Sequence, residues 1–255
     1  MALPWWTRSS AAVGAGALAT LAAEVAWVAR RDLPSFEGLD ASGPVGNGAK
    51  GEPLRIVALG DSTLTGPGLD HPDDIWLRQA LARLDHSSRP LEVLSLAVGG
   101  SRSADVLRQL PAAASHDPDL VVVAVGSNDA IYATPASALA RRIESIIVGL
   151  RATGAVVAIC NIGDLGNLER VPTPLSLALR RRSRSVAHLI ERSAARHDGA
   201  VLLDVAAADD GFRCGGVFVG DLFHPNRVGH GLWADAALPG LREALGLVEV
   251  VRPRR

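Results

Sequence analysis

Short apolar runs alternate with helix-like segments along most of this chain. Five runs of six to eight residues, rich in Val, Ile, Leu and Ala, have the pattern of strands buried on both faces. These runs are Leu54–Leu59, Leu91–Val98, Leu120–Val125, Ala155–Asn161 and Ala200–Val205. Between them, apolar residues recur every three or four positions, which predicts amphipathic helices. The predicted helices are Asp74–Leu84, Ser103–Ala114, Ala136–Leu150, Leu175–Arg196 and Val228–Leu245.

This alternation predicts an α/β fold. Helices that connect parallel strands pack on both faces of the sheet. We therefore expect a three-layer α/β/α sandwich with a five-stranded parallel sheet, of the flavodoxin-like type, over residues 54–247. Residues 248–255, which contain three arginines, are expected to form a basic tail.

The first 53 residues do not follow the alternation. Residues 11–29 form an apolar run interrupted only by Thr20 and Glu24, and they lie in an N-terminal hydrophobic segment, residues 1–31. This segment has three interpretations: a membrane anchor, a cleaved export signal or an Ala-rich surface helix. The first two imply a membrane-associated or exported protein, and the third allows a cytoplasmic one. Residues 32–53 are rich in Gly, Pro and Ser, which predicts a linker.

Small and polar residues follow three of the predicted strands. They are residues 60–62 (Gly-Asp-Ser), 99–101 (Gly-Gly-Ser) and 126–129 (Gly-Ser-Asn-Asp). Asp221 and His224 lie beyond the last strand. Ligand sites of open parallel sheets form at the carboxyl ends of the strands, so we expect these residues to meet. Ester hydrolysis needs a nucleophile, a base and donors for an oxyanion, and this set contains all three.

The same motifs resemble those of the SGNH hydrolase superfamily, the GDSL-like esterases and lipases. The match is ordered and covers roughly residues 54–245, with residues 60–62, Gly100, residues 126–129 and the Asp221/His224 pair as its four blocks. Two positions depart from the family pattern: Thr63 replaces the usual Leu, and Ser95 stands where an Asn is common. One such triplet would be a weak signal, but four ordered blocks on an α/β pattern are specific.

The resemblance implies roles for particular residues. Ser62 would be the nucleophile, His224 its base and Asp221 the acid that orients the imidazole. The oxyanion would be bound by the backbone N–H groups of Ser62 and Gly100 and by the side-chain amide of Asn128. Glycine is expected at position 100 because the absence of Cβ lets the backbone approach closely. Asp204 is an alternative acid, and we assign four further residues to substrate binding: Asp61, Asp129, Ile162 and Leu165, with residues 162–174 as a pocket wall.

The amino-acid composition limits the kinds of molecule that this protein is expected to bind. The 255 residues have a net charge of −1 and 4% aromatic residues, which argues against nucleic acid as a partner. The expected chemistry needs no cofactor and no metal. Cys160 and Cys214 are expected to be independent buried thiols, with a single disulfide as the alternative. The basic run 180–184 is either a solvated helix face or a contact to anionic lipid headgroups.

Three functions remain open at this point. The first is a serine esterase or lipase-like acyl hydrolase that acts on a small-molecule or lipid ester, with membrane association through residues 11–29 as an added expectation. The second is a carbohydrate O-acetyl esterase or acyltransferase with the same triad. The third is a non-enzymatic flavodoxin-like module that binds an anionic ligand. The sequence leaves acyl length, alcohol and oligomeric state undetermined.

Overall fold

The computed structural model describes residues 5–46, 51–84 and 89–251. Its central feature is a six-stranded sheet with strand order β1-β3-β2-β4-β5-β6. All strand pairs are parallel except the β1–β3 pair at one edge. The strands are β1 (Gly43–Val45), β2 (Leu54–Gly60), β3 (Leu91–Ser95), β4 (Leu120–Ala124), β5 (Val156–Cys160) and β6 (Ala200–Leu203).

All five predicted strands are present, which confirms the α/β architecture. The additional strand β1 lies inside the segment that we expected to be a linker, and it pairs antiparallel with β3. Three residues, Gly43, Pro44 and Val45, are too few to show alternation, and Pro is tolerated only at an edge or strand start. The sequence pattern therefore could not reveal this strand.

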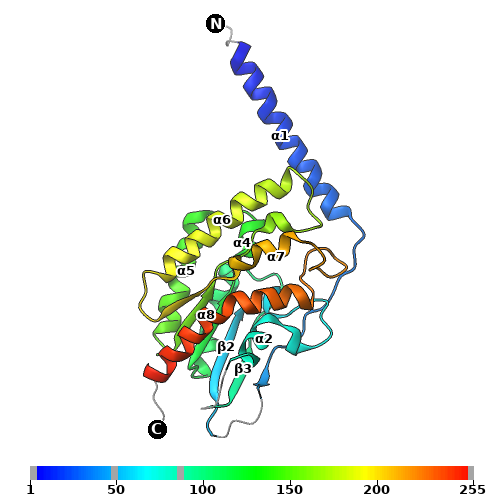
Figure 1. The fold of residues 1–255 in the computed structure, drawn as a ribbon. Coiled ribbons are helices and arrows are strands. Elements are labelled where there is room, and N and C mark those ends of the chain that lie inside the picture. Colours follow the sequence, from blue (N-terminus) through cyan, green and yellow to red (C-terminus); the bar gives the residue numbers. More distant parts are fainter. Residues whose placement is uncertain (1–4, 47–50, 85–88, 252–255) are drawn as a thin grey trace.

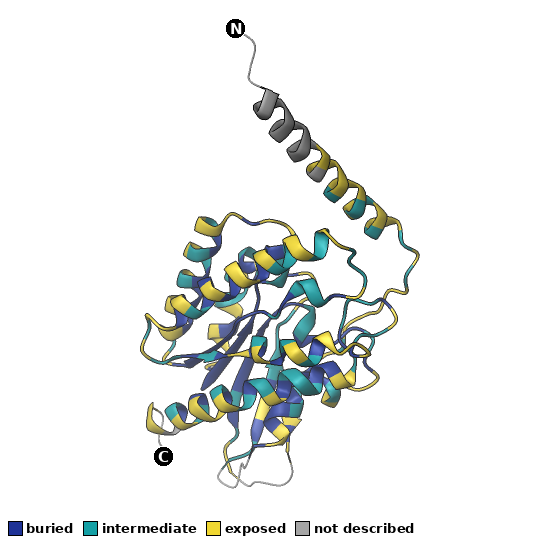
Figure 2. Ribbon diagram, turned by 45° about the horizontal axis from the view of Figure 1, so that its top comes forward, coloured by how far each residue is buried: buried dark blue, intermediate teal, exposed yellow. Residues whose placement is uncertain are grey.

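Helices cover both faces of the sheet (Figure 1). α2 (Trp76–Ala82) and α8 (Arg227–Val251) pack on one face, and their apolar residues share a core with Ile56 and Val122. α3 (Ser103–Ser115), α5 (Ala136–Arg151) and α6 (Leu175–Ala194) pack on the other face around Val121 and Ile159. Figure 2 shows the strands as the most buried layer, with exposed residues on the outer helix faces. Two short helices, α4 (Ser127–Ile131) and α7 (Asp209–Arg213), lie near the carboxyl edge of the sheet.

The C-terminal boundary differs from the predicted one. α8 continues to Val251, and Val248 is 1% exposed within the core under this helix. Residue 248 thus belongs to the domain and not to a basic tail, because the apolar stripe of α8 extends one turn further than expected. The rest of that predicted tail, residues 252–255, lies outside the described residues.

The N-terminal helix α1 (Trp5–Arg30) projects away from the domain (Figure 1). Its C-terminal part is attached to the domain: the Glu24 carboxylate accepts a hydrogen bond from the Leu175 amide, and the Arg31 guanidinium donates to the Arg170 carbonyl. In the part of the chain that the structure describes, no helix combines the length and apolar character needed to cross a membrane.

Gly60 allows β2 to pass close to β4 just before the candidate nucleophile. A Cβ at this position would lie 2.1 Å from the carbonyl oxygen of Ala124, which is a backbone atom that cannot swing away. We expect Gly60→Ala to lower the free energy of unfolding by about 3 kcal/mol, measured by urea titration. Gly246→Ala is the matched control, because nothing lies within 4 Å of its Cβ position on α8. Equal stability of both variants would contradict this explanation.

Candidate active site

Asp221 and His224 form a preorganised pair within one loop. Asp221 Oδ2 lies 2.6 Å from His224 Nδ1, while Asp221 Oδ1 accepts hydrogen bonds from the backbone amides of Phe223 and His224, each at 2.9 Å. The Asp221 residue is only 4% exposed. Asn226 fixes the same loop, since its side chain donates to the Gly216 carbonyl and accepts from the Val228 amide at the start of α8. The imidazole is thus oriented before any substrate binds.

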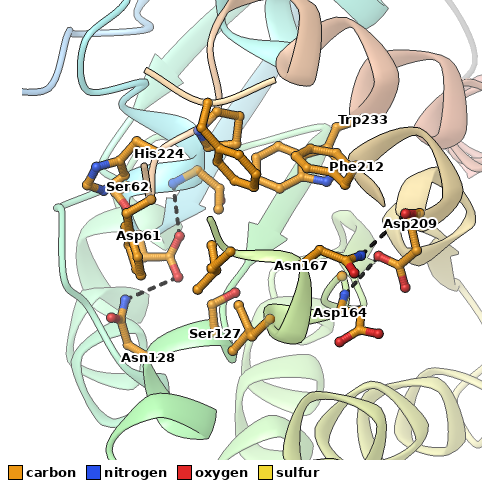
Figure 3. Close-up of a pocket in the computed structure, with 17 residues that line it drawn as sticks. Asp61, Ser62, Ser127, Asn128, Asp164, Asn167, Asp209, Phe212, His224 and Trp233 are labelled. Carbon is orange, nitrogen blue, oxygen red and sulfur yellow. Dashed lines mark hydrogen bonds between the residues drawn. The ribbon is translucent and has the colours of Figure 1, made fainter. Parts of the chain in front are cut away.

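Ser62 begins a short 3₁₀ helix, Ser62–Leu64, directly after β2. The Asp61 side chain caps this turn by accepting a hydrogen bond from the Thr63 amide at 3.0 Å. Ser62 and His224 line two cavities together, one on each side of the pair. Figure 3 shows the His224 ring next to Ser62. The structure therefore brings together a hydroxyl and an imidazole that lie 162 positions apart in the sequence.

Gly100 and Asn128 each share a cavity with Ser62. Gly100 follows β3 and lines the wider cavity, whereas Asn128 lies in α4 and lines the narrower one. The Asn128 amide donates to the Ser101 carbonyl at 3.1 Å and to Asp61 Oδ2 at 3.4 Å, which fixes its direction (Figure 3). Gly100 has a φ of +78°, and no protein atom lies within 4 Å of its Cβ position. Within the protein, its left-handed backbone conformation is therefore the reason for glycine here, and not crowding by neighbouring atoms.

The narrow cavity, which we call the aromatic pocket, has a volume of about 70 Å³. Its apolar walls come from the loop after β5 and from the C-terminal third of the chain, and they include the predicted Leu165. The Phe212 and Trp233 rings stack with centroids 5.3 Å apart. Both belong to helices that the sequence pattern did not connect to the site. The apolar residues lining the aromatic pocket are Leu165, Leu168, Phe212, Phe218, Phe223, Pro225 and Trp233.

The wider cavity, which we call the open cleft, has a volume of about 570 Å³. It is bordered by loops after β2 and β3 and by residues of the segment that precedes the domain, including Phe36 and Leu39. All four phenylalanines of the chain line one or other of these two cavities. Aromatic residues are scarce in this protein, so their positions are a sequence signal for these walls in addition to the predicted wall segment 162–174.

Two of the residues assigned to substrate binding line neither the aromatic pocket nor the open cleft. Asp129 is completely buried and accepts hydrogen bonds from the amide and hydroxyl of Ser103, at 2.7 and 2.8 Å. It thereby fastens α4 to the start of α3 and borders neither the aromatic pocket nor the open cleft. Ile162 is 5% exposed and packs in the core beside Ile190 and Val186; it lines neither of these two cavities, but it does line a third, smaller cavity that shares Asp61 and Ser127 with the aromatic pocket. The other expected pocket residues, Asp61 and Leu165, do line the aromatic pocket.

Other candidates from the sequence have different positions. Asp204 accepts a hydrogen bond from the Asn161 side chain at 2.7 Å and lines neither cavity. The basic run is not a uniform solvated face, because Arg180 pairs with Asp164 and Arg182 donates to the Ala130 carbonyl.

The two cysteines are free, so the disulfide alternative is wrong. The expectation of buried thiols holds for Cys160, whereas Cys214 is exposed. Within the described residues, no group of three or more His, Cys, Asp or Glu side chains is arranged to hold a metal ion.

Burial shifts the pKa of several ionisable groups near the site, and the shifts of Asp61 and His230 bear on the chemistry. Loss of water raises the pKa of the Asp61 carboxyl from its ordinary 3.8 to about 6, although the hydrogen bond from Thr63 opposes this change. Loss of water also lowers the pKa of His230 to about 3, with a smaller contribution from His224. His230 Nδ1 accepts a hydrogen bond from the Trp76 amide, so this histidine serves as a neutral core residue and not as a second base.

The raised pKa of Asp61 is expected to make the stability of the folded protein depend on pH. Between pH 3.8 and about 6 the folded protein keeps the Asp61 proton while the unfolded chain releases it, so this group's contribution to stability falls as pH rises. We expect the free energy of unfolding of Asp61→Asn, relative to wild type, to rise by roughly 3 kcal/mol between pH 4 and pH 7. Urea titrations at both pH values measure the difference, in which the contribution of His230 cancels. A difference that does not vary with pH would refute the assignment.

The family of this chain can now be stated. Residues 58–232 match the model of the GDSL-like Lipase/Acylhydrolase family, and this range is more than half of the chain. The chain belongs to the GDSL-like lipase/acylhydrolase family, a class of carboxylic ester hydrolases. The resemblance drawn from the four sequence blocks is thereby confirmed.

Individual relatives agree with this placement. Esterase TesA from Pseudomonas aeruginosa is 31% identical over 108 residues, which are 42% of this chain and 53% of TesA. The chain thus matches about half the length of this curated relative. The crystal structure of TesA superposes with a TM-score of 0.62 at 24% identity, covering 74% of this chain and 99% of that one. The acetyl-xylooligosaccharide esterase Axe2 from Geobacillus superposes with a TM-score of 0.55 at 15% identity, over 76% and 96% of the two chains. These two superpositions confirm the fold.

Proposed function

We propose that this protein is a serine esterase that cleaves carboxylic esters with Ser62, His224 and Asp221. The observation that carries the proposal is the Asp221–His224 pair, held by three hydrogen bonds inside one loop and facing the same two cavities as Ser62. A buried acid, an oriented imidazole and a hydroxyl at a strand end are the parts that nucleophilic acyl transfer requires.

Acylation follows from this arrangement. Asp221 occupies Nδ1 of His224, so Nε2 is the nitrogen that can accept the Ser62 proton. As Ser62 Oγ bonds to the acyl carbon, the proton passes to Nε2, and the Asp221 carboxylate stabilises the imidazolium. The tetrahedral intermediate then collapses, the ester C–O bond breaks, and His224 returns the proton to the departing alkoxide. Water repeats these steps on the acyl-enzyme and releases the carboxylic acid.

The oxyanion is bound by the backbone N–H groups of Ser62 and Gly100 and by the amide of Asn128. One Asn128 N–H is held by the Ser101 carbonyl at 3.1 Å. The contact to Asp61 is longer, 3.4 Å, and therefore weaker, so the second N–H is the one that would exchange Asp61 for a substrate oxygen through a small rotation of the whole amide group. Such fixed donors favour the charge that develops in the transition state.

Cavity size favours a short acyl group. The aromatic pocket is apolar and measures only about 70 Å³, which suits an acyl group of a few carbons. Hydrolysis of acetyl esters, including those of carbohydrates, is therefore a second candidate with the same residues. A transfer to a second alcohol would use the same acyl-enzyme.

A fluorophosphonate probe tests the function directly. The expected result is one covalent adduct, located on Ser62 by peptide mass spectrometry, together with loss of activity on 4-nitrophenyl esters. A panel from acetate to palmitate is expected to show highest kcat/KM for the shortest chains. A folded protein that remains unlabelled would behave as a binding module, and modification of another serine with loss of activity would also overturn the proposal.

A further inference from the structure

The segment before the catalytic domain forms one wall of the open cleft. We call residues 34–45 the N-terminal strap; it lies outside the family match, which begins at residue 58. Phe36, Gly38, Leu39 and Asp40 of the strap line the same cleft as Ser62 and His224. Part of the candidate substrate site is therefore built from residues that the family pattern does not include.

The strap is fastened to the domain along its length. The Leu39 amide donates to the Thr65 carbonyl at 2.6 Å, just beyond the nucleophile turn. Arg78 is 8% exposed and donates to the carbonyls of Ala41 and Pro44, at 3.1 and 2.9 Å. At its end the strap becomes β1 of the sheet. A segment held in this way can present side chains to a substrate in fixed positions.

Phe36 is placed as a contact surface. Its ring lies 3.2 Å from the Cβ position of Gly68 and 3.8 Å from that of Gly220, so one side of the ring packs on the domain. The residue nevertheless stays 39% exposed, and it borders the cleft. Val98, across from the strap on the loop after β3, is 57% exposed. An apolar surface is thus left uncovered beside Ser62 and His224.

The two cavities differ in the ester group that each can accept. The alcohol must take its proton from His224 and then leave, so it needs an opening to solvent beside the imidazole. The open cleft offers this exit, and its volume of about 570 Å³ far exceeds the 70 Å³ of the aromatic pocket. The acyl group stays on Ser62 until water attacks, which the smaller, apolar pocket allows.

The charge on the wall of the open cleft limits which alcohol groups of an ester the cleft can bind. Among the described residues that line the cleft, Asp40 and His224 are the only ionisable ones. The hydrogen bond from Ser42 keeps the pKa of Asp40 below its ordinary value, so this carboxylate is charged at neutral pH. An anionic alcohol group would meet this negative charge without a cationic partner in the cleft wall.

From these contacts we propose that the N-terminal strap forms the subsite for the leaving alcohol and selects esters of bulky alcohols that carry no negative charge. This inference rests on the proposed esterase function. It identifies Phe36 as the apolar contact and Asp40 as the group that disfavours anions.

The test compares acetates that differ only in the alcohol: ethyl acetate, 2-naphthyl acetate and 6-sulfo-2-naphthyl acetate. For Phe36→Ala, the ratio of kcat/KM for naphthyl over ethyl acetate is expected to fall about ten-fold. For Asp40→Asn, kcat/KM for the sulfonated ester relative to the neutral one is expected to rise about two- to five-fold. Val148→Ala on α5 is the control, because this residue is 52% exposed, lines neither cavity and should keep all ratios.

A purely structural strap would give another result. If the strap were only structural, Phe36→Ala would lower kcat/KM for all three acetates equally. Asp40→Asn would keep the wild-type ratio of kcat/KM for the sulfonated over the neutral ester. These results would overturn the inference. Phe36→Leu, which keeps an apolar side chain on Gly68, is expected to give an intermediate ratio and replaces Phe36→Ala should that variant not fold. Leu165→Ala, in the aromatic pocket, should instead change the preference between naphthyl acetate and butyrate. Absence of hydrolysis of all three acetates by the wild type would refute the esterase function itself, and full acetate hydrolysis by Ser62→Ala would refute Ser62 as the nucleophile; neither result would depend on the strap subsite.

Discussion

Replacement of Ser62 by Ala is expected to lower kcat/KM for ester substrates by about 10⁴- to 10⁶-fold. The substitution removes the only atom that can form the acyl-enzyme, while the Asp221–His224 pair and the Asn128 amide keep their positions, since neither depends on the Ser62 hydroxyl. Stopped and steady-state assays on 4-nitrophenyl acetate measure the loss. Thermal unfolding should be close to that of the wild type, because Ser62 Oγ lies at a partly exposed turn.

Ser127→Ala is the control for this prediction. Ser127 also carries a hydroxyl into the aromatic pocket, near Asn128, but it has no oriented base beside it. We expect less than a ten-fold change in kcat/KM for this variant. If Ser62→Ala and Ser127→Ala lost activity to a similar extent, Ser62 would have no special role as the nucleophile. A fully active Ser62→Ala would exclude the mechanism.

The catalytic constellation could be predicted from sequence because its parts are local. Strand ends are marked by short apolar runs that stop at Gly60, Gly99 and Gly126, and parallel topology brings those ends to one edge. The spacing of three positions from Asp221 to His224 already places the expected acid and base in one turn. Such signals depend on neighbouring residues, and Ser62, His224, Gly100 and Asn128, which carry them, line the aromatic pocket or the open cleft in the structure.

The walls of the site could not be predicted in the same way. Phe212, Trp233 and Phe36 reach the cavities through tertiary packing of segments that carry no motif. Asp129 illustrates the opposite error, because a carboxylate three positions after a glycine at a strand end looks the same in the sequence whether it points to substrate or into the core. Only the hydrogen bonds from Ser103 distinguish the two. The composition of residues 32–53, rich in Gly and Pro, likewise concealed β1 and the strap contacts.

Asp61 is buried and contacts two parts of the candidate site. Its carboxylate holds the turn that begins with Ser62 and contacts the Asn128 amide, so one side chain positions both the proposed nucleophile and a proposed oxyanion donor. Burial of this charge costs stability above pH 6. Active sites commonly retain such costs because the same groups fix the geometry that the reaction needs.

The second large effect is expected for Asp221→Asn, which should lower kcat by about 10⁴-fold without unfolding the protein. The Asn carbonyl oxygen can still accept the amides of Phe223 and His224, as Asp221 Oδ1 does. Its NH₂ group then replaces Oδ2, 2.6 Å from His224 Nδ1, and a donor at this position requires Nδ1 to be the acceptor. The ring proton moves to Nε2, so the nitrogen that faces Ser62 can no longer accept its proton.

Asp204→Asn provides the matched comparison, because Asp204 is the other acid at a strand end and its contact to Asn161 lies outside both cavities. We expect this variant to retain kcat within a few-fold of wild type, because removal of the Asp204 carboxylate changes no group that touches His224. The pH profile separates a wrong tautomer from a general loss of structure: Asp221→Asn should recover activity at alkaline pH, where a hydroxide-dependent path needs no Ser62 deprotonation by His224. If Asp204→Asn were inactive and Asp221→Asn active, Asp204 and not Asp221 would be the acid of the triad. The hydrogen bonds between Asp221 and His224 would then not contribute to catalysis.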